Sequence, residues 1–208
     1  MSGRLRVALA AEPLERLAVD VVAVGISADE RPLQGCAGRA DWRLCGRLSA
    51  LLEQGRLRGE LGEAALLPST GGLRASLILA VGHGRLQDLD RTRCREIARD
   101  AVARALDLRA ASLALPLVDP VSGTPALEVR LVELMQGAFE AWARDRPEFA
   151  LEIVAAAGEA PAVAEFLRAG RDLPEGFQVA LPRGNERGSR RPPRGIEVAA
   201  PVDSQPVK

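Results

Sequence analysis

The feature that most constrains the fold is a regular alternation of strand-like and helix-like segments along the chain. The clearest strand is 76–81, because residues 77–81 are uninterruptedly apolar, as in a strand that is buried on both faces of a sheet. The intervening segments carry apolar residues at helical spacing, such as the stripe from Cys94 to Leu106. Alternation of this kind predicts a layered α/β domain with a mostly parallel sheet.

The same patterns predict the individual elements. Strands are expected at 6–11, 19–26, 63–67, 76–81, 112–117, 149–155 and 177–181. A first helix is expected to begin at Asp41 as its N-cap and to bury Trp42, Cys45, Leu48, Leu51 and Leu52. A second helix follows Asp90, a third extends from Leu127 to Trp142, and a fourth begins at Pro161 and ends near Gly170. Both tryptophans are therefore predicted to lie in the core.

Composition and charge indicate one globular domain with a tail. Aromatic residues are only 3% of the chain, so the core must be aliphatic. From Pro182 onward Pro, Gly, Arg and Ser dominate without periodicity, which predicts a domain at 1–173 and a disordered tail at 174–208. From Arg183 to Lys208 there are five Arg and one Lys against three acidic residues, and the whole chain is neutral, so the rest of the chain is slightly acidic. This balance gives no electrostatic footprint for nucleic acid and argues against it as a partner.

The sequence also favours a cytoplasmic setting. The first apolar run, at 7–11, is too short for the core of a signal peptide, and no stretch has the eighteen or so apolar residues of a membrane span. Cys36, Cys45 and Cys94 are too widely spaced for a metal knuckle and are odd in number. We interpret them as small buried apolar residues.

Several short motifs follow one another in a fixed order, although none is specific alone. They are Pro32-Leu-Gln-Gly35, Asp41-Trp-Arg-Leu-Cys-Gly46, Gly59-Glu-Leu-Gly-Glu63, Leu77-Ile-Leu-Ala-Val-Gly-His-Gly84 and Gly137-Ala-Phe139. Their order resembles the N-terminal domain of the leucyl (cytosol) aminopeptidase family, which typically has a Lys where this chain has Glu60. The resemblance covers about 5–173 and predicts a free-standing copy of that domain.

This resemblance implies a three-layer fold like that of macro domains, with a mixed, mostly parallel sheet flanked by helices. The family's peptidase half carries a catalytic Lys, several metal-binding carboxylates and an Asn-Thr-Asp-Ala-Glu-Gly-Arg signature, and this sequence has none of these. Lys208 is its only lysine, and two-metal hydrolysis requires carboxylates that converge on both ions. We therefore expect no catalytic residue, metal or cofactor, and no aminopeptidase activity from this chain alone.

The first candidate ligand site contains Gly35 and Gly38, which take the place of the macro-domain glycine-rich loop. Glycines let backbone N–H groups approach a phosphate, and a helix N-terminus adds a favourable dipole. The macro pattern usually has Asn residues at the end of the preceding strand, where this chain has Gly25, Ile26 and Ser27. The simpler interpretation is that these glycines serve a tight turn.

The second candidate site is Gly82, His83, Gly84 and Arg85, at the carboxyl end of the clearest strand. Ligands commonly bind at this edge of α/β sheets. His83 is the only histidine in the chain, and an arginine such as Arg85 can meet an anion. The simpler interpretation is a turn that leaves His83 exposed in a loop.

Three functions remain open on the sequence. The first is a non-catalytic binding or regulatory module, whose partner is an aminopeptidase or another protein. The second is a binder of a small anionic ligand of the nucleotide or ADP-ribose type, which would use the two glycine-containing sites. The third is an accessory role, either as one half of a split aminopeptidase or as a nucleic-acid-binding regulator, and the neutral net charge weakens its nucleic-acid form.

Overall fold

A seven-stranded sheet in the order β3-β4-β2-β5-β6-β1-β7 forms the centre of the domain. The computed structural model describes residues 3–118, 124–143, 147–156, 158–170 and 177–179. The strands are β1 (Leu5–Leu9), β2 (Val21–Ser27), β3 (Ala64–Pro68), β4 (Leu77–Gly84), β5 (Ser112–Pro116), β6 (Phe149–Val154) and β7 (Phe177–Val179). Among the strand pairs of the described residues, only β3–β4 is antiparallel. The predicted mixed, mostly parallel sheet is confirmed.

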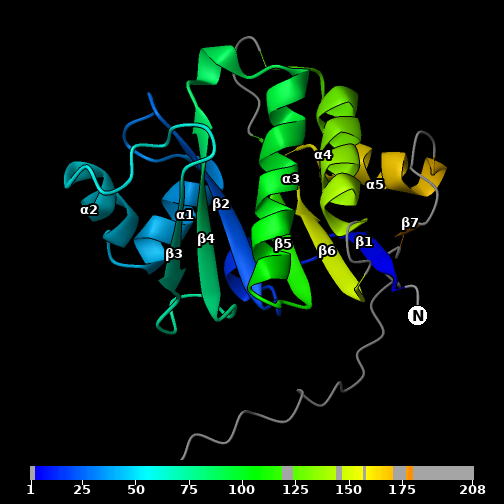
Figure 1. Ribbon diagram of the computed structural model, residues 1–208, viewed down its shortest axis with the longest axis horizontal. Helices are drawn as coiled ribbons and strands as arrows, with labels where there is room; N and C mark the ends of the chain where they lie inside the picture. Colours follow the sequence, from blue (N-terminus) through cyan, green and yellow to red (C-terminus); the bar gives the residue numbers. More distant parts are fainter. Residues whose placement is uncertain (1–2, 119–123, 144–146, 157, 171–176, 180–208) are drawn as a thin grey trace, which may run out of the picture.

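Helices cover both faces of this sheet, which makes three layers (Figure 1). The α-helices are α1 (Gly35–Arg43), α2 (Arg47–Glu53), α3 (Arg91–Asp107), α4 (Leu127–Trp142) and α5 (Ala160–Ala169), with short 3-10 turns at Leu14–Arg16 and Leu86–Asp88. Core contacts place α3, α4 and α5 on one face, and α1 and α2 on the other. Figure 1 shows α3 and α4 side by side in front of the sheet. In the described part of the chain, no helix has the length and apolarity to cross a bilayer.

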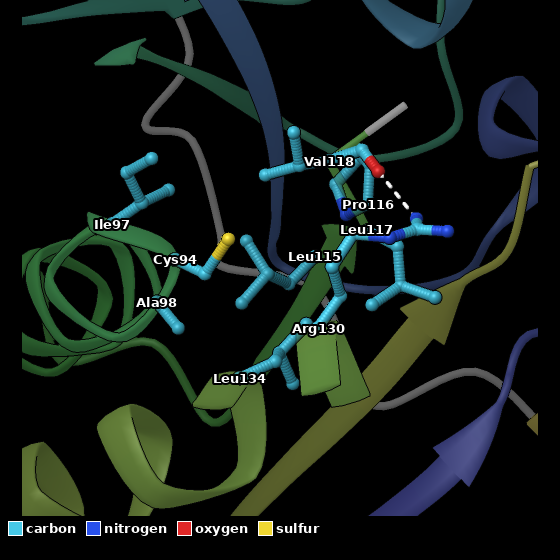
Figure 2. A pocket seen from close by; sticks show the side chains of 9 residues that line it. All are labelled: Cys94, Ile97, Ala98, Leu115, Pro116, Leu117, Val118, Arg130 and Leu134. Carbon is cyan, nitrogen blue, oxygen red and sulfur yellow. Dashed lines mark hydrogen bonds between the residues drawn. The ribbon is translucent and has the colours of Figure 1, made fainter. Parts of the chain in front are cut away.

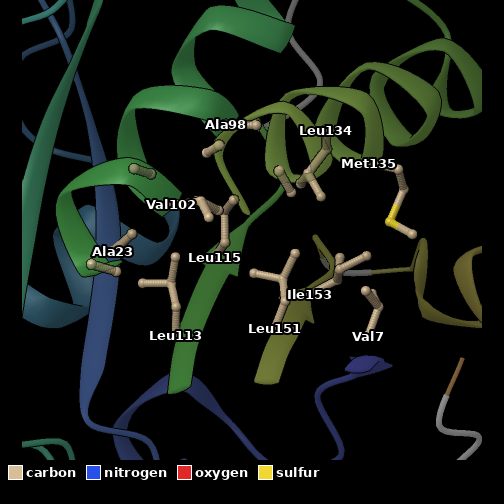
Figure 3. Close-up of a cluster of buried hydrophobic side chains, with 14 of the residues drawn as sticks. Val7, Ala23, Ala98, Val102, Leu113, Leu115, Leu134, Met135, Leu151 and Ile153 are labelled. Atoms are coloured by element: carbon tan, nitrogen blue, oxygen red, sulfur yellow. The ribbon is translucent and has the colours of Figure 1, made fainter. Parts of the chain in front are cut away.

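The core is divided in two by the sheet, because successive side chains of a strand point to opposite faces. Val21 and Ala23 of β2 pack toward α3 and α4, whereas Val22 and Val24 pack toward α1. Figure 3 shows the first of these clusters, in which strand leucines such as Leu113 meet helix residues from α3 and α4. Both clusters consist mainly of Leu, Val, Ile and Ala, as the scarcity of aromatic residues predicted.

The α3–α4 pair follows the sequence prediction closely. The Asp90 carboxylate accepts the N–H of Arg93 at 2.9 Å and caps α3, and the predicted stripe is buried from Cys94 to Ala105. Trp142 ends α4 with 3% of its surface exposed, and its indole N–H donates to the Pro147 carbonyl at 2.7 Å. The prediction that Trp142 lies in the core is confirmed.

Two residues of α4 bring it against α3. Gly137 permits a close approach, since a methyl group there would lie 2.2 Å from the Arg95 carbonyl oxygen. Glu133 is 1% exposed, and each of its carboxylate oxygens meets one arginine of α3: Oε1 accepts from Arg91 Nε at 2.9 Å and Oε2 from Arg95 Nε at 2.7 Å. These paired, charge-assisted hydrogen bonds neutralise a carboxylate that burial would otherwise destabilise.

The prediction for the first helix is wrong in its limits. Instead of one helix capped by Asp41, the chain forms α1 from Gly35 and α2 from Arg47, with a break at Cys45 and Gly46, whose φ angles are 54° and 80°. Asp41 lies inside α1 and caps α2, because its carboxylate accepts the backbone N–H groups of Leu48 and Ser49 at 2.7 and 3.2 Å. This break reverses the predicted orientation of several side chains.

Three residues of this region therefore differ from the prediction. Trp42 is 82% exposed instead of lying in the core. Cys45 is exposed and Cys36 only half-buried, so of the three cysteines Cys94 alone is buried as predicted. Leu48 does lie in the core, because α2 packs this side chain against the sheet.

The remaining differences concern element limits. β4 continues to Gly84, so the predicted turn at Gly82–Gly84 is wrong and these residues belong to the strand. β7 pairs with β1 beyond the domain boundary predicted at 173. Pro161 is the second residue of α5, which ends at Ala169 and has Gly170, with a φ of 60°, as its C-cap. Apart from β7, the predicted tail at 174–208 lies outside the described residues.

Candidate functional site

The predicted ligand edge of the sheet contains a small cleft at the carboxyl ends of β2, β4 and β5. The chain leaves β2 toward α1 on one face and leaves β4 toward α3 on the other, so the two neighbouring strands form a topological switch point. We call this cavity the strand-end cleft, and its volume is about 30 Å³. The residues that line it are Gly25, Ser27, Glu30, Gln34, Cys36, Ala37, His83, Leu86, Pro116, Leu117 and Val118.

His83 fills part of this cleft. Its imidazole lies over Gly25 of the neighbouring strand, where a methyl group would come within 2.0 Å of the ring Cε1. The register places His83 at a β-bulge, because Ile26 pairs with Gly82 and Ser27 pairs with Gly84, which leaves His83 as the extra residue of β4. The prediction of an exposed loop histidine is therefore wrong: His83 is a partly buried strand residue that requires glycine opposite it.

Burial also fixes the charge of His83. It lowers the pKa of the imidazole from its ordinary value to about 4, so the ring is neutral at neutral pH. Among the described residues, no acid or hydroxyl hydrogen bonds to this ring, so no orienting group of the kind found in nucleophile–base devices is present there. His83 therefore lines the cleft as a neutral polar side chain.

The charge of the cleft does not favour an anion. Glu30 is the single charged side chain among the described residues that line it. Arg85, predicted to meet an anion, does not line the cleft; its side chain is 61% exposed and lies 3.8 Å from the Asp29 carboxylate. Asp29 also accepts the N–H of Leu86 at 3.0 Å, which fixes this acid beside Arg85.

Gly82 and Gly84 have a packing role away from the cleft. A methyl group on Gly82 would lie 1.9 Å from the Glu60 carbonyl oxygen, and the N–H of Gly84 donates to the Gly59 carbonyl at 2.8 Å. The turn at 59–63 is itself held by Glu63, whose carboxylate accepts the N–H groups of Arg58 and Gly59 at 2.7 and 2.8 Å. Gly82 and Gly84 of β4 therefore allow the backbone of this strand to lie against the backbone of the 59–63 turn.

Gly35 and Gly38 begin α1 and stay outside the cleft lining. Gly35 has a φ of 51°, and the N–H of Gly38 donates to the Gln34 carbonyl at 2.8 Å. A methyl group on Gly38 would lie 2.5 Å from the Leu33 carbonyl oxygen, so this glycine also serves a close backbone contact. Of the six predicted ligand residues, His83 alone lines the cleft.

The sequence argument missed the other side chains of the cleft. Glu30, Gln34 and Cys36 line it together with His83. They come from the loop before α1 and from its first turn, which the prediction of a helix start at Asp41 had left as an irregular loop. The glycines at 35 and 38 were the available sequence signal, because glycines are compatible with the start of a helix as well as with a tight turn.

A second cavity, of about 10 Å³, lies between α3, α4 and the end of β5 (Figure 2). Arg130 borders it and is 3% exposed; its guanidinium donates to the Val118 carbonyl at 2.6 Å and pairs with Glu159. Cys94 also borders it, and burial raises the pKa of this thiol to about 11. A protonated thiol beside a fully paired arginine indicates a structural role.

In the described part of the chain, no group of three or more His, Cys, Asp or Glu side chains lies close enough together to bind a metal ion.

Known structures share the fold of this domain. A mutant of the Oceanobacillus iheyensis macrodomain aligns over 78% of this chain and 90% of its own, with 12% identity and a TM-score of 0.59. The same macrodomain in a structure with ADP gives a TM-score of 0.60 at 11% identity, over 76% of this chain and 87% of its own. A tomato leucine aminopeptidase mutant aligns over 82% of this chain and 37% of its own, with 17% identity and a TM-score of 0.60. The fold is therefore macrodomain-like, as predicted.

Sequence comparison supplies the family. Residues 21–141 match the N-terminal domain of the cytosol aminopeptidase family, so this chain belongs to that family. A probable cytosol aminopeptidase of Halorhodospira halophila is 40% identical over 86 residues, and the cytosol aminopeptidase of Pseudomonas aeruginosa is 34% identical over 99. These matches cover 41% and 48% of this chain but only 17% and 19% of the relatives. The predicted resemblance to this domain is confirmed.

Proposed function

We propose that this chain works by binding, as a non-catalytic recognition or regulatory module of the cytosol aminopeptidase family with a protein as its partner. The family match supports this proposal, because it covers the N-terminal domain. The partner class that follows is an aminopeptidase catalytic domain or a protein that acts with one, in the cytoplasm.

The observation that carries the proposal is the size and lining of the strand-end cleft. Sites for drug-sized ligands usually enclose about 300–1,000 Å³, and this cleft encloses about 30 Å³, which is room for ordered water. His83 occupies the space above Gly25, and Glu30 adds a negative charge to the lining, which disfavours an anionic ligand. The sheet edge is therefore better suited to structural packing than to a nucleotide.

The second candidate function is binding of a nucleotide or ADP-ribose-type ligand. It is favoured by the position of the cleft, which is the switch point of a macrodomain-like sheet, and by the ADP in one macrodomain neighbour. Calorimetry separates the two functions. We expect no saturable heat from ADP-ribose with the natural chain or with Glu30→Gln, which removes the charged group of the cleft.

Saturable heat that increases in Glu30→Gln would instead support the ligand-binding function. Catalysis is tested in parallel with leucine p-nitroanilide in the presence of Zn²⁺ or Mn²⁺, where we expect no turnover above the metal blank. The protein partner is sought by co-purification of the tagged full chain from its native cell. Failure to recover any specific partner would count against the proposed function.

A further inference from the structure

The α1–α2 corner carries an exposed tryptophan beside an apolar groove. The groove encloses about 480 Å³, and we call it the Trp42 groove. The residues that line it are Pro32, Leu33, Gly38, Asp41, Trp42, Cys45, Gly46 and Ser49. Trp42 is 82% exposed, whereas the next most exposed large apolar residue of the described chain, Leu66, is at 46%.

The fold holds Trp42 outward. Ala40 and Leu44, on either side of it in sequence, are buried against the core and fix the rotation of the last turn of α1. The chain then breaks at Cys45 and Gly46, and Asp41 caps α2 through three hydrogen bonds to Leu48 and Ser49. The indole is thus presented by a rigid, capped helix junction, which lowers the entropy cost of binding a partner there.

The charges around the groove are one-sided. Arg39, Arg43 and Arg47 are exposed on α1 and α2. Asp41 is the only carboxylate from position 31 to position 52, and it is buried and used by the α2 cap. Arg43 lies 3.9 Å from Glu15, whereas no described carboxylate pairs with Arg39 or Arg47. Arg39, three residues before Trp42 in α1, and Arg47, the first residue of α2, therefore have charges that are available to an acidic partner.

We propose that the Trp42 groove binds a protein segment that inserts an apolar side chain beside the indole and places Asp or Glu side chains against Arg39 and Arg47. The proposal rests on the proposed function, since it names the surface and the partner chemistry of a binding module. Tryptophan and arginine are the residues that most often dominate interface energetics. The apolar lining favours a protein over a nucleic acid, which would require several stacking side chains along a basic track.

The test uses the full chain carrying Trp142→Phe, so that Trp42 is the only fluorophore. Acrylamide should quench Trp42 freely in the chain alone. Random peptides displayed on phage are then selected on the full chain, and synthetic copies of the selected sequences are titrated by Trp42 fluorescence. We expect the selected peptides to share one apolar residue flanked by Asp or Glu.

Variants then locate the binding surface. In the natural background, with labelled peptide, Trp42→Ala should weaken binding at least about tenfold. Arg39→Glu and Arg47→Glu should each weaken it several-fold and reduce its dependence on salt. Arg168→Glu, an exposed charge reversal on α5, is the matched control and should leave affinity unchanged.

Other occupants give distinct results, and each would overturn the proposal. Protection of Trp42 from acrylamide in the chain alone would mean that a segment of this chain covers it. A dimer in sedimentation velocity that Trp42→Ala dissociates would assign the groove to a second copy. Tighter binding of single-stranded oligothymidylate than of any peptide would assign it to nucleic acid. A co-purified partner that still binds Trp42→Ala would leave the proposed function standing and remove this surface.

Discussion

The two helix layers differ in the exposure of their tryptophan and arginine side chains. On one face, α4 ends in a tryptophan that is 3% exposed, and two arginines of α3 neutralise the buried Glu133. On the other face, the last turn of α1 carries a tryptophan that is 82% exposed, and Arg39, one turn before it, has no carboxylate partner among the described residues. The first face uses aromatic and basic residues to close the core, whereas the second presents them to solvent. This contrast separates a structural face from a candidate recognition face.

Replacing each tryptophan in turn gives the most direct test of the difference between the two faces. Trp142→Ala should lower the free energy of unfolding by about 3–5 kcal/mol, because it leaves a cavity in the core. Trp42→Ala should change it by less than about 0.5 kcal/mol, because the exposed indole loses few contacts on truncation. Urea unfolding followed by circular dichroism measures both. Similar losses from the two variants would show that Trp42 also belongs to the core.

A second prediction concerns His83, at the sheet edge between the two layers. Folding lowers its pKa from 6.5 to about 4, so the unfolded chain binds more protons between these values. The stability due to neutral His83 is therefore present above pH 6.5 and is lost as the pH falls toward 4. The loss should reach at most about 3 kcal/mol.

Urea unfolding at pH 7 and pH 4.5 tests this, with His83→Gln as the matched variant. The variant should show a smaller loss of stability on acidification than the natural chain, since glutamine does not titrate. Equal losses in the two proteins would assign the acid sensitivity to other groups.

The third prediction tests how tightly the structural face is packed. Gly137→Ala should destabilise the domain by about 2 kcal/mol, because the added methyl group meets the Arg95 carbonyl at 2.2 Å. In an unpacked helix the same change would stabilise by about 1 kcal/mol, so the sign itself is informative. Gln136→Ala, one position earlier in α4, is the control and should be nearly neutral. Thermal unfolding compares the two, and a stabilised Gly137→Ala would refute the close contact.

Much of the fold could be predicted from the sequence where local pattern and tertiary packing agree. The strand at 76–81, the Asp90 cap and the stripe along α3 were all readable, because periodicity and capping are properties of neighbouring residues. The candidate site was less readable. His83 looked like part of a Gly-x-Gly turn, and only the packing of the 59–63 turn and of Gly25 against β4 keeps it in a strand.

The first helix shows the same limit. Trp42, Cys45 and Leu48 have helical spacing, so one continuous helix with all three on its buried face was the natural prediction. The chain instead breaks at Cys45 and Gly46, where Asp41 satisfies the free N–H groups of the next helix. A buried carboxylate that caps a helix seven residues later cannot be distinguished by pattern from an ordinary N-cap.

The sequence by itself determined the alternation of strands and helices, the aliphatic core and the membership of the aminopeptidase N-terminal family, because these depend on residue order and local spacing. Tertiary structure decided which glycines permit backbone contacts, why His83 is neutral and why Trp142 is buried while Trp42 faces solvent. The physical reason is that exposure and pKa depend on which distant segments pack against a side chain, and spacing along the chain does not specify those neighbours.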